Sequence, residues 1–103
     1  MENIYKILWS DEALKNLKTI INYLETNWSE KELKQFAKLL DKRLILIKGN
    51  PYMFPKINHP NDIRKSVLSK QTTIFYKIVN HTIRLVALFD NRQNSESLKD
   101  KLL

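Results

Sequence analysis

The sequence contains no cysteine and only two histidines among its 103 residues. Without cysteine the chain can form neither a disulfide nor a thiolate metal site, so its stability must come from packing, as in proteins of the reducing cytosol. His59 and His81 lie far apart in the sequence, and neither belongs to a motif with metal-ligand spacing. We therefore expect a cytoplasmic protein with no metal site and no cofactor.

Long hydrophobic runs are also absent. The apolar run near the N-terminus is too short for a signal peptide, and no segment approaches the roughly 20 apolar residues of a membrane span. A chain of 103 residues is long enough to bury roughly 65% of its unfolded surface, but it is too short for two domains. The sequence therefore predicts a single domain over residues 1–103 with no membrane association.

Positive charge is in excess, and it is unevenly distributed. The net charge is +7, of which residues 1–55 contribute +2, with nine Lys and Arg against seven Asp and Glu. Residues 56–92 carry seven basic residues against Asp62 and Asp90, a net of +5, and the last eleven residues balance. This basic second half predicts an anionic partner, either nucleic acid or an acidic protein segment; a basic surface that serves only solubility is the alternative.

Two amphipathic helices are predicted over residues 10–49. Ser10 is a candidate N-cap, and Ser29 with Glu32 has the spacing of a capping box at the start of the second helix. Gly49, the only glycine, is expected to form a left-handed C-cap before Asn-Pro ends the helix. Since about two residues join the helices, they must form an antiparallel hairpin. Apolar residues recur at three- and four-residue steps in both: Ala13, Leu14, Leu17, Ile20, Ile21, Leu24 and Trp28, then Leu33, Phe36, Ala37, Leu40, Leu44 and Ile47.

Four short segments rich in β-branched and aromatic residues are predicted strands: 4–9, 63–68, 72–79 and 82–90. The connections between the last three are so short that each neighbouring pair must be a hairpin. The predicted fold is therefore α+β in the order β-α-α-β-β-β, a mainly antiparallel sheet with the helical hairpin packed on one face.

The last hairpin predicts which side chains share a face of the sheet. If residues 80–81 form a two-residue turn, Lys77 lies directly opposite Arg84. The face expected to meet the helices is nearly all apolar: Thr72, Ile74, Tyr76, Ile78, Ile83, Leu85, Ala87 and Phe89. The other face is mixed: Thr73, Phe75, Lys77, Arg84, Val86, Leu88 and Asp90.

This mixed face is the candidate binding surface. Two cations directly opposite one another destabilise a sheet by a fraction of a kcal/mol, so they call for water or a counter-charge. If the preceding hairpin also has a two-residue turn, Arg64 and Ser66 join the mixed face. Cations would then surround Phe75, Val86 and Leu88, which suits an acidic amphipathic peptide as well as a nucleic acid. Basic stems lying over a solvated face are the alternative, although the apolar patch would then stay exposed.

The stretch Leu88–Asn94 divides between strand and turn. Leu88 is expected on the mixed face and Phe89 in the core, while Asp90 and Asn91 are expected to end the strand by bonding local backbone amides. Arg92 follows them beside the basic mixed face and has no structural role in this scheme.

Motifs along the chain resemble the RelE/ParE superfamily of bacterial type II toxins. The resemblance covers essentially the whole chain and rests on W-S-x-E-A-L (Trp9 to Leu14), N-P-x-x-F-P (Asn50 to Pro55), I-R-K-S (Ile63 to Ser66), I-F-Y-K-I (Ile74 to Ile78) and F-D-N-R-Q-N (Phe89 to Asn94). It implies a small toxin that is neutralised by an acidic, amphipathic antitoxin. That expectation agrees with the basic, partly apolar face.

The RelE-like branch of this superfamily implies a metal-independent ribonuclease. Its members cut mRNA on the ribosome with a basic cluster on the open sheet face, and the matching positions here are Arg64, Ser66, Thr73 and Arg92. Ser66 and Thr73 can neither take a proton from a ribose hydroxyl at neutral pH nor offset phosphorane charge as a cation would. Lys77 could substitute, whereas alternation places Lys65 on the helix side.

The ParE-like branch implies a poison of DNA gyrase that lacks the nuclease cluster and carries a long helical hairpin. We therefore favour this branch, with the RelE-like ribonuclease and a non-toxic or degenerate binding module as alternatives. If the protein is a ribonuclease, its candidate catalytic residues are Arg64, Arg92 and Lys77. The residues predicted to contact the antitoxin or another anion are Arg64, Lys77, Arg84, Arg92 and Phe75.

Overall fold

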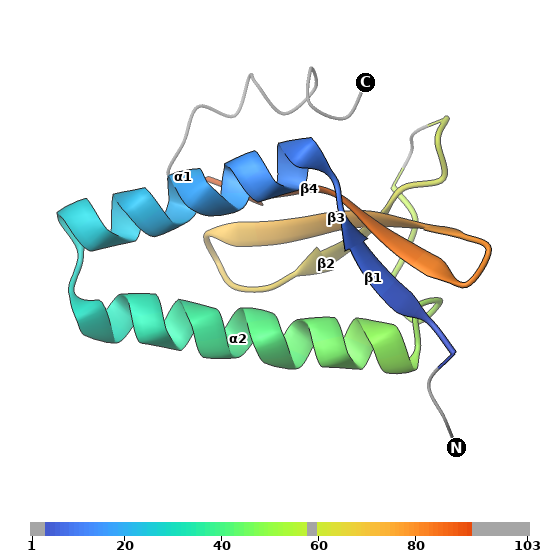
Figure 1. Cartoon of the computed structure of the whole chain (residues 1–103), viewed down its shortest axis with the longest axis horizontal. Helices are drawn as coiled ribbons and strands as arrows, with labels where there is room; N and C mark the ends of the chain where they lie inside the picture. The colour runs from blue at the N-terminus through green and yellow to red at the C-terminus, as the bar shows by residue number, and fades with distance from the viewer. Residues whose placement is uncertain (1–3, 58–59, 92–103) are drawn as a thin grey trace.

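The computed structural model describes residues 4–57 and 60–91 of the chain (Figure 1). Its elements are β1 (Lys6–Trp9), α1 (Asp11–Asn27), α2 (Glu30–Gly49), β2 (Arg64–Val67), β3 (Thr72–Val79) and β4 (Thr82–Asp90). The predicted order and α+β class are confirmed, and the two long strands begin and end where the sequence places them. Neither described helix is long and apolar enough to cross a membrane.

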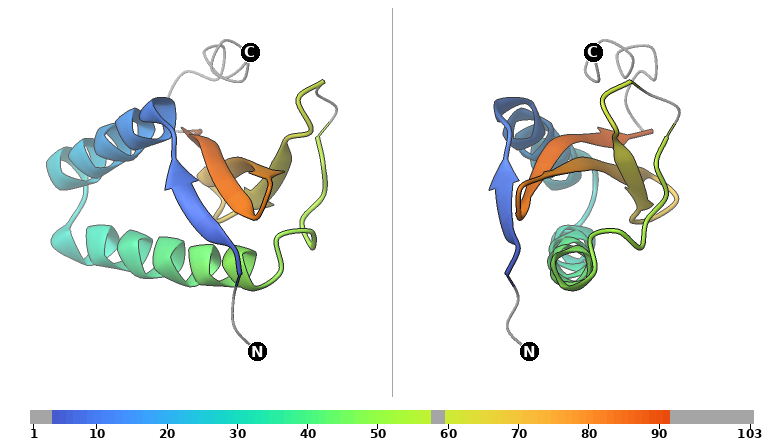
Figure 2. Two further views of the ribbon diagram at one scale, coloured as in Figure 1. Left: turned by 45° about the vertical axis from the view of Figure 1, so that its right-hand side comes forward. Right: turned by 90° about the vertical axis from the view of Figure 1, so that its right-hand side faces the viewer.

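The strands form one mixed sheet in the order β1-β4-β3-β2 (Figure 2). β1 runs parallel to β4, whereas β3 is antiparallel to both β4 and β2. The helical hairpin returns the chain from β1 to the far side of the sheet, and the last three strands then fold back until β4 lies beside β1.

The two predicted N-caps differ in the structure. Ser10 caps α1 as expected: its Oγ accepts the Ala13 N–H at 3.0 Å and also donates to the carbonyl of Val86 at 3.0 Å. Ser29 occupies the N-cap position of α2, but it makes no side-chain bond to the backbone. Its hydroxyl donates instead to the carboxylate of Glu32 on the exposed surface.

The end of α2 corrects one prediction. Gly49 is the last helical residue and does not have a positive φ, so it is not a left-handed C-cap. Asn50 ends the helix with φ −153° and ψ 77°, outside the helical region, and its N–H is still bonded to the carbonyl of Leu46 at 3.1 Å. The proline that follows explains this ending, because it disfavours the helical conformation for the residue before it.

The core lies between the helices and the inner face of the sheet. α1 packs on β4, and buried side chains from both helices meet β3 and β4 in one cluster. Members of this cluster include Ala13, Ile20, Leu24, Leu40, Ile47, Leu68, Ile74, Tyr76, Ile83, Leu85 and Leu88. Burial at these positions confirms the predicted stripes in part, because Leu14, Trp28 and Ala37 were also predicted to be apolar contacts but are exposed.

A β-bulge in β4 overturns part of the predicted face assignment. Tyr76 pairs with Leu85 as expected, but Phe75 pairs with Ala87, so Val86 has no partner across the ladder. Beyond the bulge the alternation is reversed, because one extra residue in a strand moves every later side chain to the other face. Leu88 therefore lies in the core and Phe89 on the outer face, the opposite of the prediction.

Helix α1 satisfies the backbone groups that surround the bulge. Ser10 donates to the Val86 carbonyl, and the Asn16 side chain accepts the Leu88 N–H at 3.0 Å. Asn16 is itself buried and donates to Glu12 at 2.7 Å. Backbone groups at the bulge therefore bond to side chains of Ser10 and Asn16 where a regular strand would bond to its neighbour. Because these buried groups are paired, the core accommodates the bulge.

The β2–β3 turn overturns a second assignment. The amide of Leu68 bonds to the carbonyl of Thr72 at 2.9 Å, so three residues form the turn where two were assumed. Arg64 consequently pairs with Tyr76 and Ser66 with Ile74, which places both on the helix side of the sheet. Lys65 pairs with Phe75 and lies on the outer face, contrary to the prediction.

Candidate functional site

The face of the sheet that points away from the helices is the candidate site, and we call it the open face. The strand register assigns to it Lys6, Leu8, Lys65, Val67, Thr73, Phe75, Lys77, Val79, Thr82, Arg84, Ala87 and Phe89. This set contains four cations and no acidic residue. The imbalance makes the open face attractive to anions.

Two cations of the open face stand directly opposite one another. Lys77 pairs with Arg84 across the β3–β4 ladder, as predicted, and Arg84 is flanked on its other side by Leu8 of β1. Within the described residues, the two ion pairs are on α2 and in the loop before β2, so neither involves an open-face cation. Lys6, Lys65 and Arg84 are exposed and Lys77 is half-buried. Each therefore has charge to offer to a partner.

Apolar side chains accompany these cations. Leu8 is 52% exposed and Val67 is 56% exposed, and Val79 lies exposed near the β3–β4 turn. Phe75 lies on this face, as predicted, but it is only 6% exposed, so its ring is covered. The apolar contacts that the open face can offer come from its two outer strands and the hairpin end.

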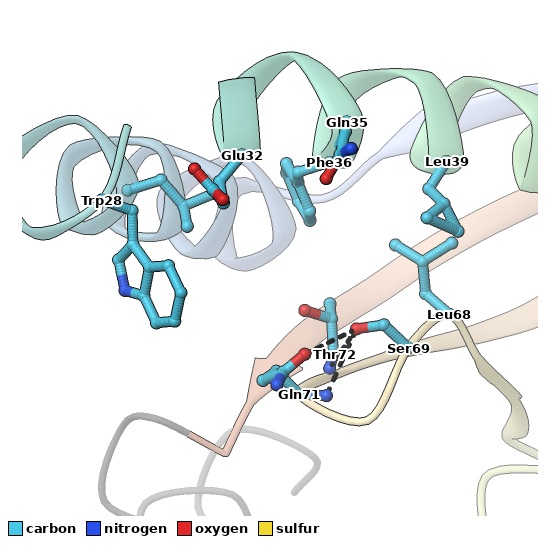
Figure 3. Close-up of a pocket in the computed structure, with 10 residues that line it drawn as sticks. Trp28, Glu32, Gln35, Phe36, Leu39, Leu68, Ser69, Gln71 and Thr72 are labelled. Carbon is cyan, nitrogen blue, oxygen red and sulfur yellow. Dashed lines mark hydrogen bonds between the residues drawn. The ribbon is translucent and has the colours of Figure 1, made fainter. Parts of the chain in front are cut away.

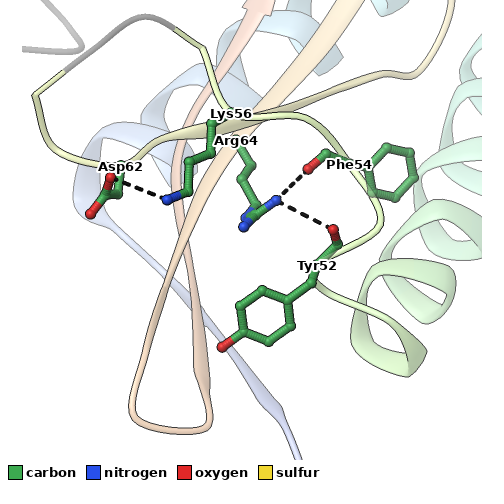
Figure 4. Close-up of polar contacts among 5 residues, drawn as sticks. All are labelled: Tyr52, Phe54, Lys56, Asp62 and Arg64. Atoms are coloured by element: carbon green, nitrogen blue, oxygen red, sulfur yellow. Dashed lines mark hydrogen bonds and ion pairs between the residues drawn. The ribbon is translucent and has the colours of Figure 1, made fainter.

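Arg64 contacts the segment that follows α2 (Figure 4). Its Nη1 donates to the carbonyl of Phe54 at 2.6 Å and to that of Tyr52 at 3.3 Å. Its guanidinium carbon lies 5.2 Å from the centre of the Tyr52 ring, a cation–π distance. Arg64 thereby fastens the segment after α2 to strand β2.

Tyr76 fastens the same segment from strand β3. It is fully buried, and its O–H donates to the Pro51 carbonyl at 2.7 Å. Burial raises the pKa of Tyr76 to about 12, and the positive charge of Arg64 opposes this shift only in part. The neutral phenol is therefore the form that the fold requires.

Arg43 is a residue that the sequence analysis missed. It lies on α2, and its Nη1 donates to the Ser66 Oγ and to the Val67 carbonyl, both at 2.8 Å. Its guanidinium carbon also lies 5.6 Å from the ring centre of Phe54. The helical pattern could not single it out, because a basic residue in the middle of a long helix normally faces solvent.

Three of the four positions that match the nuclease cluster are described, and these three do not converge. Arg64 and Ser66 lie on the helix side and are engaged by the loop and by Arg43, while Thr73 lies on the open face. Arg92 is outside the described residues, so its predicted anion contact stays a prediction. The open-face cations sit at other positions.

A family model described as ParE toxin of type II toxin-antitoxin system, parDE, matches residues 7–95. The chain belongs to the ParE toxin family. That match spans every helix and strand except the first residue of β1, which agrees with the resemblance seen along the whole sequence.

Solved structures share the ParE-like fold at low sequence identity. A chain from the structure entitled chromosomal ParDE TA system from P. aeruginosa superposes with a TM-score of 0.71 at 9% identity, covering 86% of this chain and 98% of that one. A chain of the E. coli DinJ-YafQ toxin-antitoxin complex gives a TM-score of 0.60 at 13% identity, with 85% and 93% covered. No curated protein matches the sequence significantly.

Proposed function

We propose that this protein is a toxin that inhibits DNA gyrase and that a small acidic antitoxin neutralises it by binding the open face. The observation that carries the proposal is the ParE family match over residues 7–95. Gyrase is the target that the ParE-like branch implies, and the uninterrupted helical hairpin of 10–49 is the other feature that the branch leads us to expect.

The arrangement of the nuclease positions supports the gyrase target over ribosome-dependent RNA cleavage. Proton transfer in that reaction would need a basic group within hydrogen-bond reach of the ribose hydroxyl. Arg64 is held by two loop carbonyls, and Ser66 and Thr73 cannot act as bases at neutral pH. Removing one charge-stabilising group commonly costs about a hundred-fold or more in rate.

The charge and polarity of the open face support an acidic, amphipathic antitoxin. Four cations without an ion pair in the described structure would meet acidic side chains, while Leu8, Val67 and Val79 would meet apolar ones. Electrostatic attraction of this kind accelerates association and makes affinity fall with salt. The antitoxin complex should therefore weaken markedly as ionic strength rises.

The target is tested by inducing the protein in bacteria and following translation and chromosome integrity in parallel. A gyrase inhibitor should cause DNA breaks and filamentation while translation continues, and purified protein should reduce supercoiling by gyrase. Early translation arrest with an intact chromosome, together with cut mRNA on programmed ribosomes, would replace this proposal with the ribonuclease.

The same assay tests the alternative of a harmless binding module. We expect the antitoxin to be a small acidic protein encoded by the adjacent gene, and its co-expression should restore growth. A protein that causes no growth defect on induction, although it accumulates in folded form, would not be an active toxin.

A further inference from the structure

A pocket at the tip of the helical hairpin lies apart from the open face. It has a volume of about 170 Å³ and is bounded by the end of α1, the first turns of α2 and the β2–β3 turn. Figure 3 shows the helical side chains on one side of this pocket and the turn on the other. Its lining includes Trp28, Glu32, Phe36, Ser69 and Thr72.

The apolar part of the pocket matches one aromatic ring in size. A cavity of about 150 Å³ is enough to admit benzene when its walls are apolar. Here Trp28 and Phe36 supply aromatic walls, with Leu24 and Leu68 beside them. Trp28 is 47% exposed, so an inserted ring would cover apolar surface that the fold leaves open.

The polar part of the pocket contains an unsatisfied hydroxyl. Thr72 is 1% exposed, and its Oγ1 has no hydrogen-bond partner within the described structure. Ser69 beside it is fully used, because its Oγ accepts the amides of Gln71 and Thr72, both at 3.2 Å, and donates to the Gln71 side chain. A buried hydroxyl without a hydrogen-bond partner is unfavourable, so Thr72 favours an occupant that can bond to it.

The charge at the pocket is the third constraint. Among the described residues of the lining, Glu32 is the charged one, and no lysine or arginine accompanies it. An anion would be repelled by this carboxylate, whereas a neutral group with an O–H or N–H can donate to Thr72.

We propose that this pocket binds one neutral aromatic ring that carries an O–H or N–H donor, which is the chemistry of a phenol or an indole. The ring stacks against Trp28 and Phe36, and its donor bonds to the Thr72 Oγ1. The ring belongs either to a free small molecule or to a tyrosine or tryptophan side chain of a bound protein. The site does not depend on gyrase being the target.

The test is a solution NMR titration of the Trp9→Phe variant, in which Trp28 supplies the one remaining indole signal. The probes are p-cresol, toluene and benzoate. We expect saturable shifts at the Trp28 indole and at the amides of 69–72 with p-cresol, binding at least about threefold weaker for toluene because it lacks the donor, and none for benzoate. Shifts scattered over the surface, or equal affinity for p-cresol and toluene, would overturn the proposal.

The Thr72→Val variant tests the hydroxyl directly. It should lower p-cresol affinity to that of toluene and leave toluene binding unchanged. Thr73→Val is the matched control, since it makes the same change on the open face of the same strand. It should leave the ratio of p-cresol affinity to toluene affinity unchanged. If Thr72→Val fails to fold, Trp28→Ala at the exposed rim should abolish binding of both probes. If Thr72→Val folds and still binds p-cresol more tightly than toluene by the wild-type factor, the site is ruled out.

The source of the ring is separated by a further probe, N-acetyl-tyrosinamide. Affinity equal to that of p-cresol assigns the site to a side chain of a bound protein, because the backbone amides are then accommodated. Exclusion of this probe while p-cresol binds assigns the site to a free small molecule.

Discussion

Tyr76 and Arg64 are neighbours across the β2–β3 ladder, and both bond to the segment that follows α2. An arginine in a basic stretch is readily interpreted as an anion contact, but here its donors reach loop carbonyls. At the scale of single residues, the exposed cations of the open face are Lys6, Lys65 and Arg84, with Lys77 half-buried beside Arg84.

The buried hydroxyl of Tyr76 should make stability depend on alkaline pH. Because the pKa of Tyr76 is raised from 10.0 to about 12 in the folded protein, its proton is lost from the unfolded chain first. Its contribution to the free energy of unfolding is thus fully present below pH 10 and is lost as the pH rises toward 12. Urea unfolding of the wild type and Tyr76→Phe should show a stability difference that shrinks over this range; a constant difference would contradict it.

The β3–β4 turn offers a second prediction for a single residue. Asn80 has φ 45° and His81 has φ 50°, the left-handed region that a two-residue hairpin turn of this type requires. Since glycine adopts this conformation without strain, His81→Gly should raise the free energy of unfolding by about 1 kcal/mol. Asn80→Gly is the control and should change less, because asparagine tolerates the region. A loss of stability would mean that the ring contact of His81 with Tyr5, 5.7 Å between centroids, outweighs the strain.

At the scale of elements, α1 and β4 depend on one another through the bulge. Ser10 donates to the carbonyl of Val86 and Asn16 accepts the N–H of Leu88, so the start of the helix and the irregular strand fix each other's position. The bulge in turn decides which β4 side chains enter the core. A change at the helix N-cap is therefore a change to the sheet.

The two N-caps provide a matched pair for testing this dependence. Ser10→Ala removes the cap bond and the bond to Val86, so it should lower the free energy of unfolding by about 2 kcal/mol. Ser29→Ala should change it by less than about 0.5 kcal/mol, because that hydroxyl bonds only to Glu32 on the surface. Chemical denaturation measures the free energy of unfolding of both variants. Equal losses would show that the bonds of Ser10 to the helix and to the bulge contribute no extra stability.

At the scale of the whole molecule, the helices bury one face of the sheet, and the open face carries the four cations. Arg84 and Lys77 repel one another across the ladder, which costs the isolated protein a fraction of a kcal/mol. An anionic partner that binds this face would offset the repulsion between these two cations, so the arrangement favours a complex over the isolated protein.

Arg84→Glu should separate stability from binding. The isolated variant should be more stable by up to about 1 kcal/mol, because a like-charge pair becomes an opposite-charge pair. Its association with the acidic antitoxin should slow by about tenfold, with a reduced salt dependence. Lys38→Glu, on the exposed side of α2, is the control and should alter neither property much. Unchanged antitoxin binding by Arg84→Glu would remove the open face from the proposed interface.

The sequence by itself determined the elements, the fold class and the family. Helical periodicity, caps, short turns and β-branched runs are local signals, and they located α1, α2, β3 and β4 to within a residue or two. The Asn80–His81 turn also determined that Lys77 faces Arg84, because a two-residue loop leaves one register. These features need no knowledge of distant contacts.

Only the tertiary structure decided which face of the sheet the side chains of β2 and of the end of β4 occupy. Val86 has nothing in its sequence that marks a bulge, since the bulge is stabilised by Ser10 and Asn16 of α1. The three-residue turn after β2 likewise moved Arg64 to the helix side, where the loop carbonyls engage it. A one-residue change of register moves every later side chain of a strand to the other face of the sheet. In β4 the contacts that stabilise this change come from another element of the fold.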